Sequence, residues 1–312
     1  MPQVAKVMPI SARKIWATRL CFWMKSNMER AILRCFQAAT ILALAGCASP
    51  LVLENHPLTG EIWDIRAQAF IPEDELLARL PAAAHVILGE THDNPVHHRL
   101  QRRVLNALAP AGRRTLAMEQ FDTGHQAALD AARAGGAGAE ALADAGALDR
   151  KGWSWPLYRP LVEFALEHGW PITAANLSRA EARRIVADPA ASGLAPISAI
   201  LKEKLEHDMI EGHCGQRPDA KRLTGMIEAQ RARDARMAEV LAAHPSTVLV
   251  AGSGHARRDR GVPAYMRGRA VLSVAFVEVE ADKITTRDYA QEFDYLWFTA
   301  RAVRDDPCKT LK

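Results

Sequence analysis

The stretch HVILGETHDN, residues 85–94, runs from apolar residues directly into Glu90, His92 and Asp93. A later stretch, STVLVAGSGHARRDRG at residues 246–261, ends in the same way, with Gly252 followed by His255. Both apolar runs are continuous rather than alternating, which is typical of parallel strands covered on both faces. We therefore predict that residues 85–89 and 247–251 are buried strands of one parallel sheet.

Along the rest of the chain, apolar runs of strand length alternate with segments of helical periodicity. Further strands are predicted at 115–118, 171–175 and 270–279, and helices at 71–79, 96–108, 123–133 and 157–168. This alternation indicates an α/β fold with a mainly parallel central sheet and flanking helices. The run 270–280 alternates apolar and acidic residues near its end, so we expect it to be an edge strand with one face in water.

The segment 180–244 breaks this rhythm because it contains almost no β-branched runs. Apolar residues recur at helical spacing in 197–211 and in 219–243. We predict an inserted helical subdomain at 180–244, able to cover the end of the sheet. The α/β core then consists of 63–179 and 245–312. Within it, the Ala- and Gly-rich segment 131–148 is predicted to be a connector that is helical in part.

The N-terminal residues have the layout of a secretory signal. From Met28 the chain has a short basic start, an apolar stretch too short to span a bilayer, and small residues before Cys47. LAGC, residues 44–47, matches the bacterial lipobox, whose cysteine is lipidated. We predict a signal peptide at 1–46, with Met28 as the true start, and a lipid anchor and tether at 47–62. The alternative is a frayed helix with a buried cysteine.

The predicted location follows from the same segment. Lipid chains on Cys47 would hold the protein on a membrane without crossing it. Ala48, rather than an aspartate, follows the cysteine. This residue favours the periplasmic side of the outer membrane of a Gram-negative bacterium.

The positive charge of the chain is concentrated in the predicted signal peptide. Seven Lys and Arg residues against one Glu precede Cys47, a charge of +6, so the remainder of a chain with net charge +4 carries −2. A mildly acidic body does not favour binding to nucleic acid.

Two of the five cysteines remain after the signal and the lipidation site are set aside. These are Cys214 and Cys308, which in an oxidising periplasm could form one disulfide. The alternative is two unrelated thiols.

Polar residues follow every predicted parallel strand. Because parallel strands deliver their carboxyl ends to one edge, where ligands bind, we expect these residues to lie together despite their separation in sequence. They are Glu90, His92 and Asp93, then Glu119 and Gln120, then Asn176, and finally His255 with Arg257 and Asp259. Two imidazoles, several carboxylates and an amide would suit a metal, a haem or acid–base chemistry. Taken singly, each could be an ordinary surface or capping residue.

An aromatic cluster lies in KGWSWPLYRPLVEFA, residues 151–165, with Trp153, Trp155 and Tyr158 close together. It is either a hydrophobic plug or a flat apolar wall for a large planar ligand. Tyrosine is also a known ligand of haem iron. The chain has no G-x-S-x-G serine elbow and no nucleotide-binding glycine motif after a strand.

Taken together, ILGETHDNPVHH, AMEQFD, WPLYRPLVEFA, PITAANLSR and AGSGHARRDRGVPAYM resemble the successive motifs of the ChaN-like haem-binding uptake lipoproteins of the Tiki superfamily. The resemblance covers about residues 63–308. It implies an α/β domain with a helical subdomain, a lipid anchor, and haem binding in iron acquisition. The positions that match the family's motifs are Glu90, His92, Glu119, Tyr158, His255, Arg257, Asp259 and Arg260.

Two functions remain open at this point. In the first, the chain is a binding protein that holds haem or another iron porphyrin. Tyr158, His92 or His255 would be on the iron, and Arg257 or another histidine on a propionate; a homodimer is compatible with this function. Cofactor-binding residues would be Glu90, His92, Glu119, Tyr158, Asn176, His255 and Arg257. In the second, it is a metal-dependent hydrolase, a protease or esterase, in which Glu90, His92 and His255 bind a divalent metal or act directly on water.

Overall fold

The structure, a computed structural model, describes residues 50–310. The predicted signal peptide, Cys47 and the first part of the tether lie outside the described residues. The described residues belong to one compact unit. None of their helices combines the length and the apolarity needed to cross a bilayer.

Eight strands form the main sheet, in the order β3-β2-β9-β8-β4-β7-β5-β6. The six strands from β9 to β6 are parallel, and β2 and β3 add an antiparallel hairpin beside β9. The strands are β2 (Ile62–Asp64), β3 (Ala69–Ile71), β4 (His85–Glu90), β5 (Thr115–Asp122), β6 (Ile172–Asn176), β7 (Thr247–Gly252), β8 (Val271–Glu278) and β9 (Tyr295–Thr299). A separate two-stranded sheet pairs β1 (Leu51–Val52) with β10 (Arg301–Ala302).

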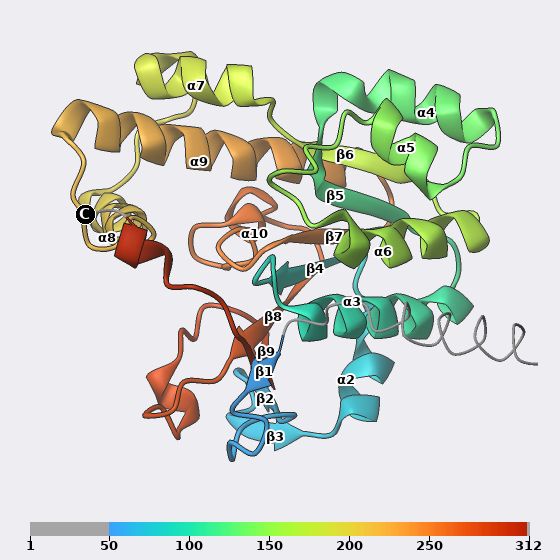
Figure 1. Ribbon diagram of the computed structural model, residues 1–312, viewed down its shortest axis with the longest axis horizontal. Coiled ribbons are helices and arrows are strands. Elements are labelled where there is room, and N and C mark those ends of the chain that lie inside the picture. The colour runs from blue at the N-terminus through green and yellow to red at the C-terminus, as the bar shows by residue number, and fades with distance from the viewer. Residues whose placement is uncertain (1–49, 311–312) are drawn as a thin grey trace, which may run out of the picture. The chain divides into compact units, whose positions relative to one another are not determined.

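Helices cover both faces of the main sheet, as Figure 1 shows. They are α2 (Glu73–Arg79), α3 (Pro95–Leu108), α4 (Gln126–Ala134), α5 (Ala139–Ala145), α6 (Trp155–Glu167), α7 (Arg179–Ala187), α8 (Ala199–Glu211), α9 (Ala220–Ala242) and α10 (Val262–Tyr265). The α/β fold class with a mainly parallel sheet and flanking helices is confirmed.

Alternate residues of the inner strands point into two different cores. In β4, Val86 and Leu88 pack with helices α2 to α6, whereas Ile87 packs with α9 and α10. Successive side chains of a strand face opposite sides of the sheet, and here both sides are covered. This double burial explains why HVILG is apolar at consecutive positions.

The prediction of an edge strand at 270–280 is wrong. Strand β8 lies inside the sheet, between β4 and β9, and its middle residues are buried. The acidic residue near its end, Glu278, does not face water; it is bound by Arg304 and Asn94. Strand β9 pairs with β8 on the side away from β4. It was not predicted, although its sequence YLWFT is apolar and fully buried.

The segment 180–244 is helical where helices were predicted, with α8 and α9 close to the expected ranges. Helix α9 is long enough to serve two roles. Its C-terminal part packs on the sheet through Met237 and Leu241, whereas its N-terminal part forms small cores with α7 and α8. The turn between α8 and α9 is joined to the C-terminal tail by the disulfide Cys214–Cys308, with 5.5 Å between the Cα atoms.

Helices α7 and α9 approach closely at Gly225. A Cβ atom at this position would overlap the carbonyl oxygen of Val186 and lie 2.8 Å from its Cα. We predict that Gly225→Ala lowers the free energy of unfolding by about 1–3 kcal/mol, because the added methyl group forces the helices apart. Urea unfolding measures the change. The matched control is Gly124→Ala, where a Cβ meets nothing within 4 Å; equal effects of the two substitutions would refute this close approach.

Candidate functional site

The site begins at the rung where β4 and β7 end. Glu90 and Gly252 are register partners across these neighbouring parallel strands. Strand β5 lies on the other side of β7 and brings Glu119 to the same edge. The two apolar runs, at 85–89 and 247–251, therefore end side by side at one edge of the sheet, as predicted.

The carboxylate of Glu90 is fully buried and is the centre of a polar cluster. It accepts a hydrogen bond from the Tyr158 hydroxyl at 2.5 Å and one from the Gln101 amide, and His92 Nδ1 lies 3.0 Å away. His98 Nδ1 lies 3.4 Å from the second carboxylate oxygen. Because a buried carboxylate is costly unless it is bound, these neighbours are what allow Glu90 to sit there.

Tyr158 is fully buried. Burial and the adjacent charge of Glu90 raise the pKa of the Tyr158 hydroxyl far above its usual range. The side chain therefore remains a neutral phenol, and its hydroxyl donates a hydrogen bond to Glu90. In this arrangement, the oxygen is not free to bind iron.

His92 is the most accessible group of this cluster, with 44% of its side chain exposed. Its Nδ1 faces Glu90, and its ring lies edge-on to Trp153, with 4.8 Å between the ring centroids. A Cβ atom on Gly252 would come within 3.0 Å of the Cε1 and Nε2 atoms of His92, so the glycine makes room for the imidazole. Burial lowers the pKa of His92, but the hydrogen bond to Glu90 and the charge of Glu119 outweigh it and raise the pKa.

A second network lies beside the first and is almost entirely buried. His255 Nδ1 lies 2.7 Å from Asp234 Oδ1, and His255 Nε2 lies 3.3 Å from Glu119 Oε1. The other oxygen of Glu119 accepts a hydrogen bond from the backbone N–H of Gly252 at 2.8 Å. The network thus fastens β5, β7 and α9 to each other at the site.

The charges of this second network are strongly coupled. Burial alone would lower the pKa of His255, but Glu119 and Asp234 raise it to about 10. Burial alone would raise the pKa of Glu119, but His255 lowers it to about 2. Burial raises the pKa of Asp234 to about 6, although His255 opposes this change. At neutral pH His255 is therefore an imidazolium held between two carboxylates, which makes it a poor general base.

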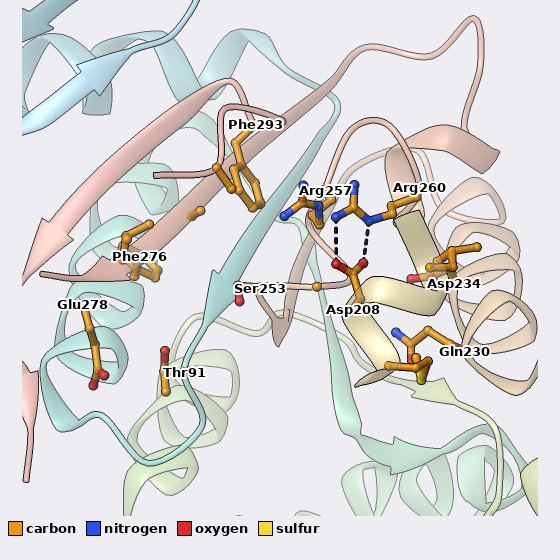
Figure 2. A pocket seen from close by; sticks show the side chains of 16 residues that line it. Thr91, Asp208, Gln230, Asp234, Ser253, Arg257, Arg260, Phe276, Glu278 and Phe293 are labelled. Carbon is orange, nitrogen blue, oxygen red and sulfur yellow. Dashed lines mark hydrogen bonds and ion pairs between the residues drawn. The ribbon is translucent and has the colours of Figure 1, made fainter. Parts of the chain in front are cut away.

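A cavity of about 460 Å³ opens next to these networks. Figure 2 shows Phe276 and Phe293 on one side of it and Asp208 with Arg257 and Arg260 on the other. Arg257 pairs with Glu292 at 2.6 Å, and Arg260 pairs with Asp208 and Asp259. Both arginines thus line the cavity, but their charges are already compensated.

Of the remaining predicted residues, Asn176 and Asp93 have structural partners, whereas the side chain of Gln120 has none within residues 50–310. The Asn176 side chain donates to the Glu119 carbonyl oxygen at 3.1 Å and accepts from Arg233, so it braces the end of β5. Asp93 points away from the site to Arg304. The amide of Gln120 is buried, and neither of its polar atoms has a hydrogen-bond partner among the described residues.

Among residues 50–310, no three His, Cys, Asp or Glu side chains are grouped so that they could hold a metal ion. Glu90 and His92 belong to one network and His255 to the other.

Several residues of the site were not predicted from the sequence. Gln101 and His98 come from one face of α3, and Asp234 and Gln230 come from α9. The strand-end rule cannot find them because they lie within helices. The spacing of His98 and Gln101, three residues apart on a helix, was the one available signal.

The family model for haem-binding uptake, Tiki superfamily, ChaN, matches residues 76–266, which contain every residue of both networks. The chain belongs to the ChaN family. The solved structure of ChaN from Campylobacter jejuni, described as binding haem cofacially, is similar, with 26% identity and a TM-score of 0.65. That match covers 76% of this chain and 95% of that chain.

Weaker structural matches also exist. The type III effector HopBA1 is 16% identical over 72% of this chain and 92% of its own, with a TM-score of 0.44. A variant of the erythromycin esterase EreC is 13% identical over 81% of this chain and 86% of its own, with a TM-score of 0.40. A comparison with curated proteins found no significant match.

The coupled histidine of this ChaN-family chain predicts how its stability depends on pH. Because the pKa of His255 is raised to about 10 in the folded protein, its contribution to stability is complete below about pH 6.5 and is lost as the pH rises through 10. We expect the free energy of unfolding to fall by on the order of 2–5 kcal/mol over this range. Urea unfolding at pH 6.5, 8 and 10 measures it.

The control variant for this measurement is His168→Gln, at an exposed histidine on the far end of α6. It should follow the wild-type pH dependence, whereas His255→Gln should be less stable at pH 7 and should flatten the curve. Equal slopes in all three proteins would refute the assignment of a buried imidazolium.

Proposed function

We propose that this protein is a lipid-anchored haem-binding protein that acts in haem or iron uptake on the periplasmic side of the outer membrane. Membership of the ChaN family supports haem as the ligand. The similarity to ChaN of Campylobacter jejuni, which extends over 95% of that chain, supports the same ligand class. The lipobox ending at Cys47 supports the anchor and the location.

The observation that carries the haem assignment is the position of His92. Of the three candidate iron ligands, it alone is substantially exposed, whereas Tyr158 is fully buried and His255 is 6% exposed. Its Nδ1 is bound to the Glu90 carboxylate, which leaves Nε2 as the ligand atom. Histidines that bind metals commonly donate their second ring nitrogen to a carboxylate, which fixes the ring and makes the ligand more basic.

The surroundings of His92 suit a flat apolar ligand. Trp153 stands next to the imidazole and is half-buried, so part of its apolar surface remains available beside His92. Haem iron held by a histidine supplies a redox-active centre. In this role the chain's own residues bind the iron through His92, orient that ring through Glu90, and keep Glu90 in place through Tyr158 and Gln101.

The alternative of a metal-dependent hydrolase needs Glu90, His92 and His255 to act together. His255 is sequestered between Glu119 and Asp234, and its raised pKa keeps it protonated at neutral pH. Only His92 of the three is open to a substrate. The geometry therefore favours binding over hydrolysis, and the experiment below separates the two.

We predict that the body from Ala48 onwards binds hemin with a saturable shift of the Soret band. His92→Ala should weaken binding at least about tenfold because the iron ligand is lost. Tyr158→Phe should retain the shift because the hydroxyl is bound to Glu90 and not to the ligand. Absorbance titration measures all of these, and sedimentation of the same samples tests for a homodimer.

The control for the titration is His168→Ala, at the opposite end of the helix that carries Tyr158. It should bind hemin like the wild type. If no protein gives a saturable shift, and a stoichiometric divalent metal is instead found and is lost in His92→Ala, the hydrolase is the better assignment. If Tyr158→Phe abolishes the shift while His92→Ala retains it, the iron ligand is the tyrosine.

We also predict that Cys47→Ser removes the lipid and releases the protein from the membrane fraction. The reason is that, in this proposal, the lipid chains on Cys47 are what hold the protein on the membrane. Mass spectrometry of the N-terminal peptide and membrane fractionation check this outcome. A Cys47→Ser protein that remains in the membrane fraction would contradict the proposed anchor.

A further inference from the structure

The first described residues, Pro50 and strand β1, pair with β10 at the edge of the sheet that carries the site. Strand β1 pairs with β10, and the carbonyl oxygen of Pro50 accepts a hydrogen bond from the N–H of Val303 at 2.8 Å. Strand β10 directly follows the carboxyl end of β9, which runs parallel to β8 and β4. The attachment point and Glu90 are therefore at the same end of the parallel strands.

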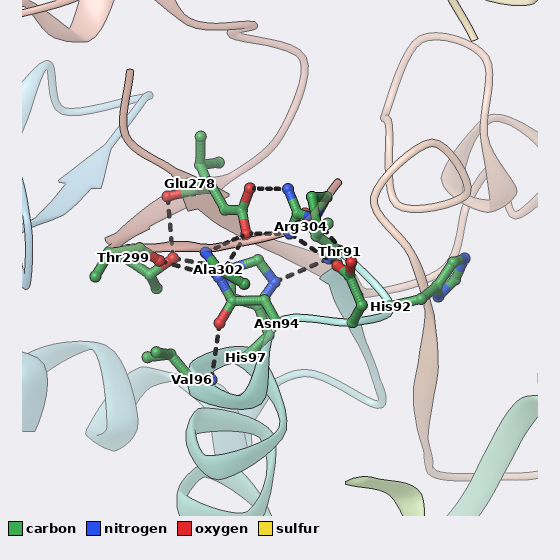
Figure 3. A network of polar contacts seen from close by, with 12 residues as sticks. Thr91, His92, Asn94, Val96, His97, Glu278, Thr299, Ala302 and Arg304 are labelled. Carbon is green, nitrogen blue, oxygen red and sulfur yellow. Dashed lines mark hydrogen bonds and ion pairs between the residues drawn. The ribbon is translucent and has the colours of Figure 1, made fainter. Parts of the chain in front are cut away.

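This attachment point is also fixed to the loop that bears His92. Arg304, two residues after β10, forms two hydrogen bonds with Asp93, at 2.7 and 2.8 Å. The same guanidinium binds Glu278, which in turn binds the Asn94 amide at 2.7 Å. Figure 3 shows this network, with His92 extending from its margin. The contacts connect β10 to the residue next to His92.

The length of the tether limits how far the lipid can be from this point. Pro50 is the third residue after Cys47. Three residues of fully extended chain span at most about 11 Å. A lipidated Cys47 therefore keeps the β1–β10 sheet within about that distance of the membrane surface.

The β1–β10 region also exposes apolar side chains. Val52 is 43% exposed, and Val303, which follows β10, is 47% exposed. Scattered exposed valines are ordinary on a protein surface. Here they lie in or next to a sheet that the tether keeps within about 11 Å of the membrane surface. Burial in the headgroup region would stabilise them.

We propose that the lipid leaflet itself covers the site-bearing edge of the sheet, so that His92 and Trp153 face the membrane surface. This inference rests on the proposed lipidation of Cys47. The ligand then exchanges between the leaflet and the protein. A large planar ligand with an apolar face and charged substituents partitions into the interfacial region of a bilayer, and a site that faces this region receives it without transfer through water.

The test compares the depth of two labels on the full-length lipidated protein in phospholipid vesicles. Lys151→Cys places a fluorophore at an exposed position two residues before Trp153, and Arg113→Cys places one at an exposed position before β5, at the opposite end of the sheet. With a rise of roughly 3.3 Å per residue, the six residues of β4 alone separate these ends by about 20 Å. Cys21 and Cys35 leave with the predicted signal peptide, Cys47 carries the lipid, and Cys214 is joined to Cys308, so the introduced thiol is available for labelling.

Quenching by lipid-attached nitroxides at the headgroup level is the measurement. We expect the label at position 151 to be quenched at least twofold more strongly than the label at 113. Equal quenching, or stronger quenching at 113, would overturn the proposed orientation. Val52→Asp with Val303→Asp should reduce the difference between the labels, whereas Val52→Ala with Val303→Ala should reduce it less.

Two further measurements separate this inference from the function on which it rests. Mass spectrometry of the N-terminal peptide reports whether Cys47 is lipidated, and hemin titration reports whether the site binds haem. A lipidated protein that binds hemin and shows the opposite quenching order refutes the orientation alone. A protein without lipid on Cys47 refutes the anchor and this inference with it, but leaves haem binding to be decided by the titration.

Discussion

The buried carboxylate of Glu90 is the constraint on which the site depends. A carboxylate removed from water is tolerated only when hydrogen-bond donors surround it. Here the donors come from α3 and α6, which lie on the same face of the sheet, and from the loop after β4. The position of Glu90 at the last residue of β4 thus holds Gln101 and Tyr158 in place. It leaves His92 partly exposed.

This constraint separates the two histidines that look equivalent in the sequence. His92 contacts the buried carboxylate with one nitrogen and has 44% of its side chain exposed, so it can serve as a ligand. His255 lies between Glu119 and Asp234 and is closed off from solvent. The first histidine is suited to meeting a ligand, and the second is suited to holding three elements of the fold together at the floor of the site.

The strands added beside β8, on the side away from β4, have a related effect. Strands β9, β2 and β3 convert β8 from an edge strand into an inner strand, and the segment after β9 returns along the edge that carries the site. Arg304 then forms ion pairs with both Glu278 and Asp93. Arg304 of the C-terminal tail is consequently bound to the loop of His92, and β1 is paired with β10 of the same tail, which links β1 to the geometry of the site.

The sequence by itself determined the α/β class, the parallel strands β4, β5, β6 and β7, and the gathering of Glu90, His92, Glu119 and His255 at one edge. Continuous apolar runs report burial on both faces, and the parallel direction brings their ends together whatever their separation in the chain. Strand β8 was wrongly predicted to be an edge strand because of Glu278. An acidic residue without a nearby partner in the sequence is expected to be exposed, and its partner Arg304 is distant in the sequence. Only the tertiary structure decided that Tyr158 is buried, that Asp234 completes the second network, and that His92 is accessible. Exposure and partner choice depend on how helices pack over a strand end, and no local pattern of residues records that packing.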